Sequence, residues 1–308
     1  MTDLVRIAAW NVNSLKVRLP HVLRWLSDQE KAKKPIDALC LQELKLTDDK
    51  YPHKELEDAG YLSIAAGQKT YNGVAIIVRR AALAPIATDL ETTFLKPIRN
   101  IPDHADDQQR ILAATVCFKG TQPIRLVSAY FPNGQSPESQ KFAYKLCWLN
   151  ALQSWLTKEL EQNQRLALLG DFNIAPQDAD VHDPKVWEGQ NLVSPQERTA
   201  FQDLLKLGFE DSFRMFEQAP KAFSWWDYRM MGFRRNAGMR IDHILLSEAL
   251  KDNCNTSIID KEPRTWEQPS DHAPVIVEIK KTWAIKHRQS DLTNLLRWPV
   301  EIKVISRL

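Results

Sequence analysis

The sequence has no strong excess of either charge. Its 308 residues include 41 Lys and Arg against 39 Asp and Glu, a formal net charge of +2. Proteins that bind duplex DNA often show a clear basic excess, and the total composition here shows none. A hydrophobic content of 44% and the even balance also exclude a highly charged, disordered chain. Any contact with an anionic polymer must therefore come from a local surface.

Cysteine is scarce and scattered, and long apolar runs are missing. The four cysteines, Cys40, Cys117, Cys147 and Cys254, form no CxxC pair, which argues against a disulfide scaffold or a zinc knuckle. The N-terminal VRIAAWNV lacks the basic start, long apolar run and cleavage site of a signal peptide. No stretch approaches the roughly 18 apolar residues of a membrane span. We therefore expect a cytoplasmic protein without a membrane segment.

Short apolar runs rich in Val, Ile and Leu recur along the chain and predict buried strands. They cover 5–12, 38–42, 74–78, 111–118, 124–130, 165–169, 241–246 and 275–279. Apolar residues at helical spacing predict a helix over 142–160, the capping box Ser194–Glu197 predicts a second one, and a third is expected around Val22–Leu26. Because strands outnumber helices, a doubly wound parallel sheet does not fit. A mixed, mostly antiparallel β core with helices outside does.

The chain contains no repeat and no Gly/Ser linker, so one domain over residues 1–284 followed by an extension, 285–308, is the simplest division. Residues 281–308 hold six Lys or Arg against two Asp or Glu, which leaves the rest of the chain slightly acidic. This extension fits a docking helix, a DNA-contacting arm or a disordered end equally well.

Polar side chains gather where the apolar runs stop. Each has an ordinary explanation when taken alone, because Asn and Asp commonly form turns at strand ends. Together, they would converge if these strands end at one rim of a packed sheet. The set comprises Asn11, Glu43, Tyr130, Asp171, Asn173, Asp242, Asp271 and His272.

Such a set suits Mg²⁺, a hard cation that takes carboxylate oxygens while keeping waters and a substrate phosphate. Carboxylates left over can act as a general base, and a His can hydrogen-bond a phosphoryl oxygen or be held by an Asp. The absence of Cys clusters disfavours zinc. Without a GxSxG elbow or a GxxxxGK[ST] loop, a serine hydrolase and a P-loop NTPase are unsupported.

Several motifs, in this order, resemble the exonuclease III family of abasic-site endonucleases, within the endonuclease/exonuclease/phosphatase superfamily. They are WNVNSL at 10–15, LQELK at 41–45, AYFPNG at 129–134, GDFNIAP at 170–176, SWWDYR at 224–229, MRIDHIL at 239–245 and PSDHAPV at 269–275. GDFN and SDH alone indicate only the superfamily. SWWDYR followed by GMRIDHIL is similar to the DNA-repair branch, and within it to the bacterial exonuclease III type.

The resemblance implies an α/β (α+β) four-layer sandwich of two mostly antiparallel β-sheets flanked by helices, with the site at one end of the strands. It implies Mg²⁺, with Mn²⁺ as a substitute, held mainly by Glu43 with Asn11 and Asp271 close by. Asp171 would be the acid or base, and Asn173 would orient the attack. The metal set it implies also takes in Asp171, Asn173 and His272. His272, fixed by Asp242, would hold the scissile phosphate, and Tyr130 would bond the phosphate or an oxyanion.

A segment rich in basic and aromatic residues overlaps the two motifs that are similar to those of DNA-repair enzymes. Residues 221–240 contain five Lys or Arg against Asp227 alone, interleaved with Trp, Tyr, Met and Phe. The ordinary reading is a loop with buried aromatics beside a solvated basic rim. The resemblance instead implies that Trp225, Met239 and Ile241 line a pocket for a flipped abasic deoxyribose. It makes Arg229 a candidate for insertion or phosphate contact, and Asn133 for another phosphate contact.

The resemblance implies a Mg²⁺-dependent phosphodiesterase that incises duplex DNA 5′ to abasic sites, trims 3′ ends and removes 3′ blocking groups, acting as a monomer. A superfamily phosphatase or RNA-cleaving relative is the alternative enzyme, for which a different segment should replace SWWDYR. A DNA-binding protein with an inactive site is a third possibility. His243, which follows Asp242, departs from the apolar residue expected there; it either packs or lies near the site.

Overall fold

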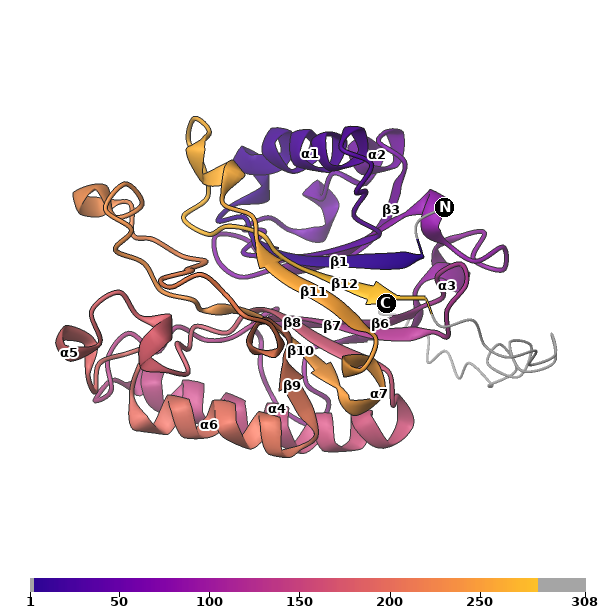
Figure 1. Cartoon of the computed structure of the whole chain (residues 1–308). Coiled ribbons are helices and arrows are strands. Elements are labelled where there is room, and N and C mark those ends of the chain that lie inside the picture. Colours follow the sequence, from indigo (N-terminus) through magenta and orange to yellow (C-terminus); the bar gives the residue numbers. More distant parts are fainter. Residues whose placement is uncertain (1–2, 282–308) are drawn as a thin grey trace, which may run out of the picture.

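The strands of the described residues, 3–281 of this computed structural model, divide into two six-stranded sheets that face each other (Figure 1). The first sheet has the order β11 (Cys254–Ile259), β12 (Val275–Lys280), β1 (Leu4–Asn11), β2 (Ala38–Gln42), β4 (Val74–Arg79) and β3 (Tyr61–Ala66). The second has the order β5 (Leu95–Arg99), β6 (Ile111–Val116), β7 (Ile124–Tyr130), β8 (Leu166–Asp171), β10 (Asp242–Ser247) and β9 (Phe209–Asp211).

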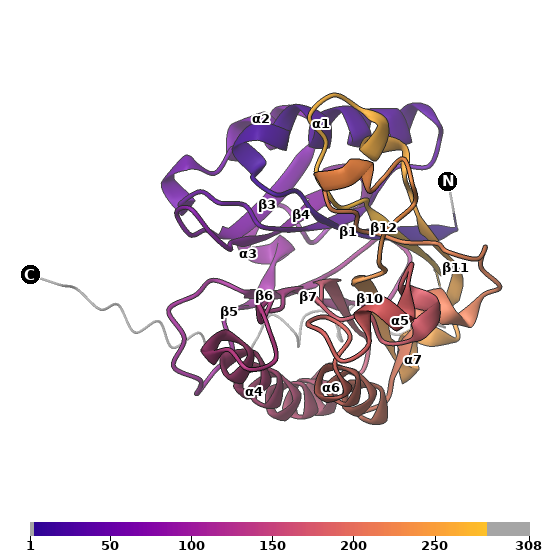
Figure 2. The same ribbon diagram turned by 90° about the vertical axis from the view of Figure 1, so that its left-hand side faces the viewer.

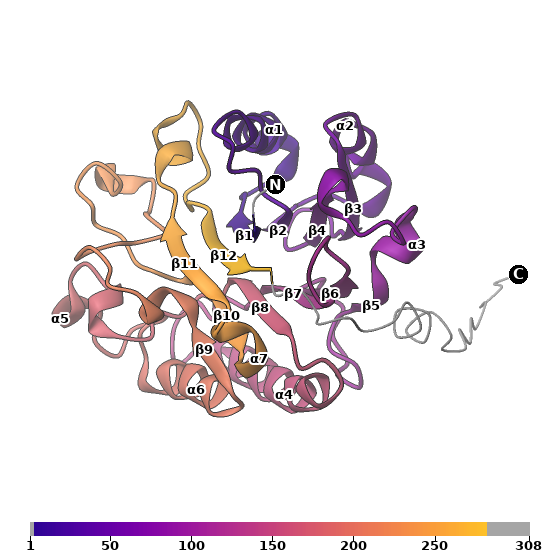
Figure 3. The ribbon, with the colours of Figure 1, turned by 45° about the vertical axis from the view of Figure 1, so that its right-hand side comes forward.

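Helices cover the outer face of each sheet and complete four layers, as Figure 2 shows. The longer ones are α1 (Leu15–Lys31) and α2 (His53–Asp58) on the first sheet, and α4 (Gln140–Gln162) and α6 (Pro195–Lys206) on the second (Figure 3). Single turns are α3 (Leu90–Thr93), α5 (Pro184–Trp187) and α7 (Glu248–Lys251), with 3₁₀ turns at Asp48–Lys50, Arg80–Ala82, Asp178–Asp180, Ser212–Met215, Arg229–Met231 and Glu262–Thr265. No helix in the described part of the chain is both long enough and apolar enough to cross a membrane.

Each sheet contains one parallel pair, β1 with β2 and β7 with β8, and its other pairs are antiparallel. The predicted mixed, mostly antiparallel sandwich is therefore confirmed. Since β1 and β2 run the same way, as do β7 and β8, the two strands of each pair end on the same side of their sheet. We call this side, where the strands end, the edge of the sheet, as distinct from its outermost or edge strands. The polar residues after these four strands are thereby collected at two facing edges.

The apolar residues explain the layering. One core cluster lies between the sheets. A second lies between the first sheet and its helices, and a third lies between the second sheet and its helices. Alternate residues of β1 follow this division: Val5, Ile7 and Ala9 face the other sheet, whereas Ala8 and Trp10 face the helices. Because side chains alternate along a strand, the last residue, Asn11, also points between the sheets.

The sequence located eight of the twelve strands of the described residues, and the four that it missed are edge strands. β5 (LKPIR) contains a proline and is largely exposed, β9 has three residues, and β11 is interrupted by a bulge. β3 carries Ser63 in its middle. Edge strands need only one hydrogen-bonded neighbour, so they tolerate prolines, bulges and polar residues that hide the apolar pattern.

Both clearer helices are confirmed, and the third, expected around Val22–Leu26, extends over all of α1. Pro20 lies inside α1, where a proline usually disfavours helix. Burial of Leu15, Val22, Trp25 and Leu26 against the first sheet outweighs that preference. The extension 285–308 lies outside the described residues.

Gly170, one residue before the end of β8, offers a test of how tightly this edge is packed. A Cβ added there would lie 2.0 Å from the carbonyl oxygen of Ala129 on β7. We expect Gly170→Ala to lower the free energy of unfolding by about 3 kcal/mol through overpacking. Gly60→Ala is the control, because its φ is also positive but nothing lies within 4 Å; about 1–2 kcal/mol of backbone strain is expected. Equal urea-denaturation losses for the two variants would contradict the close approach.

Candidate active site

The two sheets meet through a hydrogen bond at the edge where their parallel pairs end. Asn11 is the last residue of β1, and Asp171 is the last residue of β8. The Asn11 side-chain amide donates to Asp171 Oδ2 at 2.8 Å and to Glu43 Oε1 at 2.9 Å. Asp171 points between the sheets for the same reason as Asn11, since Ala167 and Leu169 of β8 belong to the inter-sheet core.

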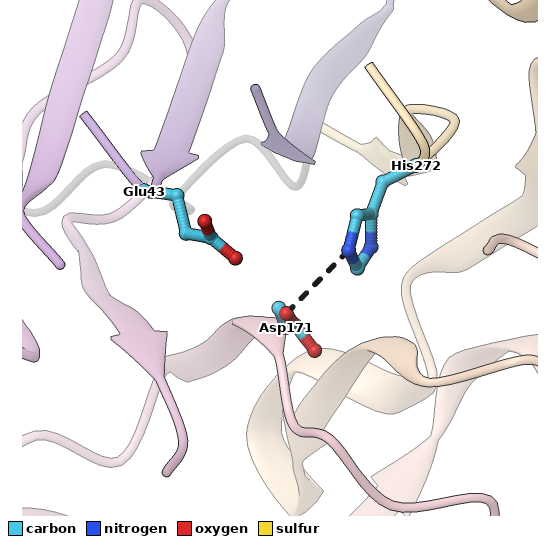
Figure 4. A group of neighbouring side chains, drawn as sticks. All are labelled: Glu43, Asp171 and His272. Atoms are coloured by element: carbon cyan, nitrogen blue, oxygen red, sulfur yellow. Dashed lines mark ion pairs between the residues drawn. The ribbon is translucent and has the colours of Figure 1, made fainter. Parts of the chain in front are cut away.

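Glu43 follows β2 in a left-handed backbone conformation, with φ of 55°. This turn brings its carboxylate toward Asp171 and His272 (Figure 4). One potential ligand atom from each of these three residues lies within 4.8 Å of the other two. Lys45 offsets part of the negative charge, because its Nζ lies 2.8 Å from Glu43 Oε2.

His272 lies between two buried carboxylates. Its Nδ1 is 2.9 Å from Asp242 Oδ2, and its Nε2 is 3.8 Å from Asp171 Oδ2. Asp242 in turn accepts a hydrogen bond of 2.6 Å from Ser224 Oγ. The imidazole is therefore fixed on one side by Asp242 and faces Asp171 with the other.

The net effect of burial and of these neighbours is to raise the pKa values of both His272 and Asp171. Burial of His272 disfavours the charged ring, but Asp242 and Asp171 outweigh it and raise its pKa to about 10. Burial raises the pKa of Asp171 to about 7, against the opposing effect of the His272 cation. Burial, followed by Glu43 and Asp171, also raises the pKa of Tyr130 well above its usual value. His272 is thus a charged donor, and Asp171 is a carboxyl able to exchange a proton.

The donor set fits a hard divalent cation. Glu43 and Asp171 supply carboxylates within reach of one position, and the carboxamide of Asn11 bonds both. His272 belongs to the same cluster, yet both its nitrogens face carboxylates, so it is better placed to donate than to bind a metal. Asp271, which the sequence also suggested, is not part of this cluster; it accepts from Asn13 Nδ2 at 2.9 Å and Trp225 Nε1 at 3.0 Å.

Asn173 and Asn133 join the same edge through their side chains. Asn133 Nδ2 donates to Asn173 Oδ1 at 3.0 Å, and Asn173 Nδ2 donates to the carbonyl oxygen of Phe131 at 3.1 Å and approaches Asp171 Oδ2 at 3.3 Å. Asn173 therefore lies beside Asp171. A contact between its side-chain amide and a metal, which the sequence suggested, would compete with these hydrogen bonds.

The three apolar residues suggested for a sugar pocket do come together. Met239 and Ile241 are buried and Trp225 partly so, in a cluster with Ala175, Val181, Leu192 and Val193. Trp225 also pairs with both Met239 and His272 in short β-bridges, which places the cluster next to His272. Arg229, by contrast, lies on an exposed turn, and its guanidinium pairs with Asp227 at 2.6 Å.

Four contributing residues were not identified from the sequence, although each lies in one of the motifs quoted above. Asn13 and Lys45 contact the carboxylates of Asp271 and Glu43, respectively. Ser224 supports Asp242, and Ser270 donates to the Asn11 carbonyl oxygen at 2.6 Å. They hold other groups of the site in place, so no pattern of metal ligands or nucleophiles would have selected them.

Comparisons with known proteins agree with this geometry. Residues 8–272 match the model of the endonuclease/exonuclease/phosphatase family. Exodeoxyribonuclease III of Haemophilus influenzae is 34% identical over 285 residues, which cover 90% of this chain and all of that protein. Exodeoxyribonuclease of Bacillus subtilis is 30% identical over 274 residues, covering 88% of this chain and 98% of that one.

Solved structures give the same picture. The 3′-5′ exonuclease NExo from Neisseria meningitidis is 42% identical, with a TM-score of 0.80, and the match covers 90% of this chain and all of that one. A NExo variant, described as a 3′ phosphatase, was solved with a product DNA hairpin. An AP endonuclease from Archaeoglobus fulgidus is 31% identical, with a TM-score of 0.78, and the match covers 89% of this chain and 99% of that one.

Glu43 provides a direct test of the metal site. We expect Glu43→Gln to weaken Mn²⁺ binding by at least about tenfold, because it removes one of two close carboxylate ligands. Isothermal titration calorimetry with Mn²⁺ measures this. Glu248→Gln, a change at an exposed Glu at the start of α7, is the matched control and should leave the affinity unchanged. An unchanged affinity in both variants would contradict a metal site at Glu43.

Proposed function

The chain belongs to the endonuclease/exonuclease/phosphatase family, in the exonuclease III group of DNA-repair nucleases, and from this we propose that it is a Mg²⁺-dependent DNA phosphodiesterase. It incises duplex DNA 5′ to abasic sites, trims 3′ ends and removes 3′ blocking groups. The observation that carries the proposal is the placement of Glu43, Asp171 and His272 around one position at the edge of the sheets. Asp242 fixes the His272 ring there.

The side chains have distinct tasks in this proposal, and Asp171 serves both the ion and the proton transfer. Glu43 and Asp171 would hold the ion, with Asn11 beside them bonding both carboxylates through its side-chain NH2, and the bound ion would neutralise the phosphodiester and stabilise the leaving oxygen. The His272 cation donates to a non-bridging phosphoryl oxygen. Tyr130 donates from its hydroxyl, since its raised pKa keeps that proton in place.

Asp171 is the better candidate for the base. Nδ1 of His272 is held by Asp242 and its Nε2 faces Asp171, and these carboxylates raise the pKa of the ring, so His272 is placed to donate a proton rather than to accept one. Asp171, whose pKa is raised by burial, can take a proton from water that Asn173 orients. The water oxygen then bonds to phosphorus, the P–O3′ bond breaks, the leaving O3′ takes a proton from solvent water, and Asp171 returns its proton to solvent. At an abasic site the products are a 3′-hydroxyl and a 5′-deoxyribose phosphate.

Two surfaces beside the site support DNA as the substrate. A cavity of about 720 Å³ has Tyr130 and Asn133 in its lining together with the exposed Lys141, which suits a phosphate backbone. On the other side, the orange segment around residues 220–240 projects beyond the strands in Figure 1. There, Met230 is 78% exposed, and the exposed Arg229 is available for a phosphate contact.

The choice of substrate rests on the apolar cluster. Met239 and Ile241 are packed against Leu192, Val181 and their neighbours, so a deoxyribose turned out of the helix has to enter next to Trp225, where the cluster is only partly buried. A 3′ terminus needs no such entry. Abasic and 3′-end substrates therefore have to be compared directly.

We place this activity in a catalytic domain over residues 1–284, acting as a monomer in the cytoplasm. The family match within 8–272 and the four cysteines, all free, support that placement.

The activity is tested on labelled duplexes with an internal tetrahydrofuran abasic analogue, a recessed 3′-hydroxyl or a 3′-phosphate, each with Mg²⁺ and with EDTA. We expect cleavage on the 5′ side of the analogue and release of 3′ nucleotides or phosphate, with Mg²⁺ only. Asp171→Asn should abolish turnover and spare DNA binding. Binding without any cleavage by the wild type would favour the inactive DNA-binding protein, and comparable cutting of undamaged RNA would favour the RNA-cleaving relative.

Arg229 tests the DNA-facing turn. Its exposed ion pair with Asp227 is worth little and exchanges readily for a phosphate. We expect Arg229→Ala to weaken duplex binding roughly fivefold and to reduce the slope of log K against log salt by about 1. Arg80→Ala is the control, because Arg80 forms a similar surface pair with Glu57 after the far end of β4. Equal effects at both positions would mean that the turn does not contact DNA.

A further inference from the structure

The backbone that follows Asp171 is held in an unusual conformation. Asn173 has a φ of 50°, in the left-handed region that non-glycine residues seldom adopt. Its amide N–H donates to Asp171 Oδ1 at 2.9 Å, so the direction of the Asp171 carboxylate depends on the backbone at 173. Whatever holds this backbone therefore orients both side chains.

Lys145 holds it from the helical layer. This α4 residue is fully buried, and its Nζ donates to the carbonyl oxygen of Asn173 at 2.7 Å and to that of Asn133 at 3.2 Å. Its third partner is the buried carboxylate of Glu197 on α6. All three ammonium protons are thus used, and two of them hold the turns that carry the interacting side chains of Asn133 and Asn173.

His243 holds the next carbonyl from the other side. On β10, Ile244 and Leu246 face the opposite sheet and so does Asp242, whereas His243 points to the outer face, between Phe172 and Phe201. Its Nδ1 lies 2.9 Å from Arg240 Nη1, and its Nε2 lies 2.9 Å from the Ile174 carbonyl oxygen.

The tautomer follows from these partners. A guanidinium can only donate, so Nδ1 of His243 must be unprotonated and accept. Burial, with Arg240 next to the ring, lowers the pKa of His243 well below its usual value, so the ring is neutral. Its one proton is therefore on Nε2 and is donated to Ile174. Arg240 is itself fixed by Asp180 and Asp211, at 2.6 and 2.8 Å.

We propose that Lys145 and His243 are positioning residues. Lys145 hydrogen-bonds to the carbonyl oxygen of Asn173 and His243 to that of Ile174, and these two bonds orient the side chains of Asn173 and Asp171 toward the substrate. The proposal rests on the function proposed above, because it assumes that Asp171 and Asn173 carry the reaction. A purely structural role would give a different outcome: loss of either hydrogen bond would lower stability but would leave turnover by the folded enzyme unchanged.

Lys145→Met removes the hydrogen bond to the Asn173 carbonyl oxygen, and Arg125→Met is its matched control. Arg125 on β7 is also buried and paired with a buried carboxylate, that of Glu159 on α4, but at the strand end away from the site. We expect kcat to fall by about 10- to 100-fold in Lys145→Met, with KM for duplex DNA changing less than about threefold. Arg125→Met should lose a similar amount of Tm and retain kcat.

His243 allows a finer test that does not depend on the fate of a buried lysine. In His243→Gln, the side-chain amide replaces Nε2 and can still donate to Ile174. In His243→Asn, the shorter amide reaches only the place of Nδ1 and can accept from Arg240. We expect Gln to retain kcat within about threefold, and Asn and Leu to lower it about tenfold or more.

Tm is measured for every variant, so that turnover can be compared at equal stability. If kcat follows Tm across all five variants, or if His243→Asn is as active as His243→Gln, the positioning role is wrong although the nuclease assignment stands. If the wild-type enzyme cleaves no DNA substrate with Mg²⁺, the proposed function fails and the positioning role fails with it.

Discussion

One hydrogen bond across the two sheets, from Asn11 to Asp171, is the contact on which the site depends. It joins the last residues of two strands that belong to different sheets and lie 160 positions apart. Both side chains reach the space between the sheets because alternation along a strand assigns them to the same inner face as the apolar residues before them. The hydrophobic core and the polar site are therefore consequences of one periodic pattern, which changes from apolar to polar where the strands end.

Collecting carboxylates at a buried edge is costly, and the structure offsets that cost with cations from several layers. His272 lies between Asp242 and Asp171, and Lys45 lies on Glu43. Behind the site, Arg240 pairs with two buried aspartates. Because a buried charge without a partner is strongly destabilising, these pairs fix the geometry as well as the charge. The near-zero net charge of the whole chain is a poor guide to function for this reason, since Glu43, Asp171 and Asp242 are gathered at the site with cationic side chains beside them.

The sequence located the strands that carry the site better than it located the rest. The four strands that end at the site were all predicted, because each is central, buried on both faces and rich in branched apolar residues. The missed strands are edges, where the requirement for burial is relaxed. The same holds for the site residues. Those that bear carboxylates or imidazole could be named as candidates, whereas Ser224, Ser270 and Lys145 act by holding other groups and have no chemical signature of their own.

The sequence alone determined the family, the layer architecture and the residue types of the site, since these depend on local apolar periodicity and on motifs read in order. Only the tertiary structure decided which groups face each other. It placed Asp271 outside the close cluster of Glu43, Asp171 and His272, made His272 a charged donor between carboxylates, and turned His243 away from the site toward Ile174. Distances between strands, burial and the shared use of each donor and acceptor are properties of the packed sheets, and no stretch of the chain carries them by itself.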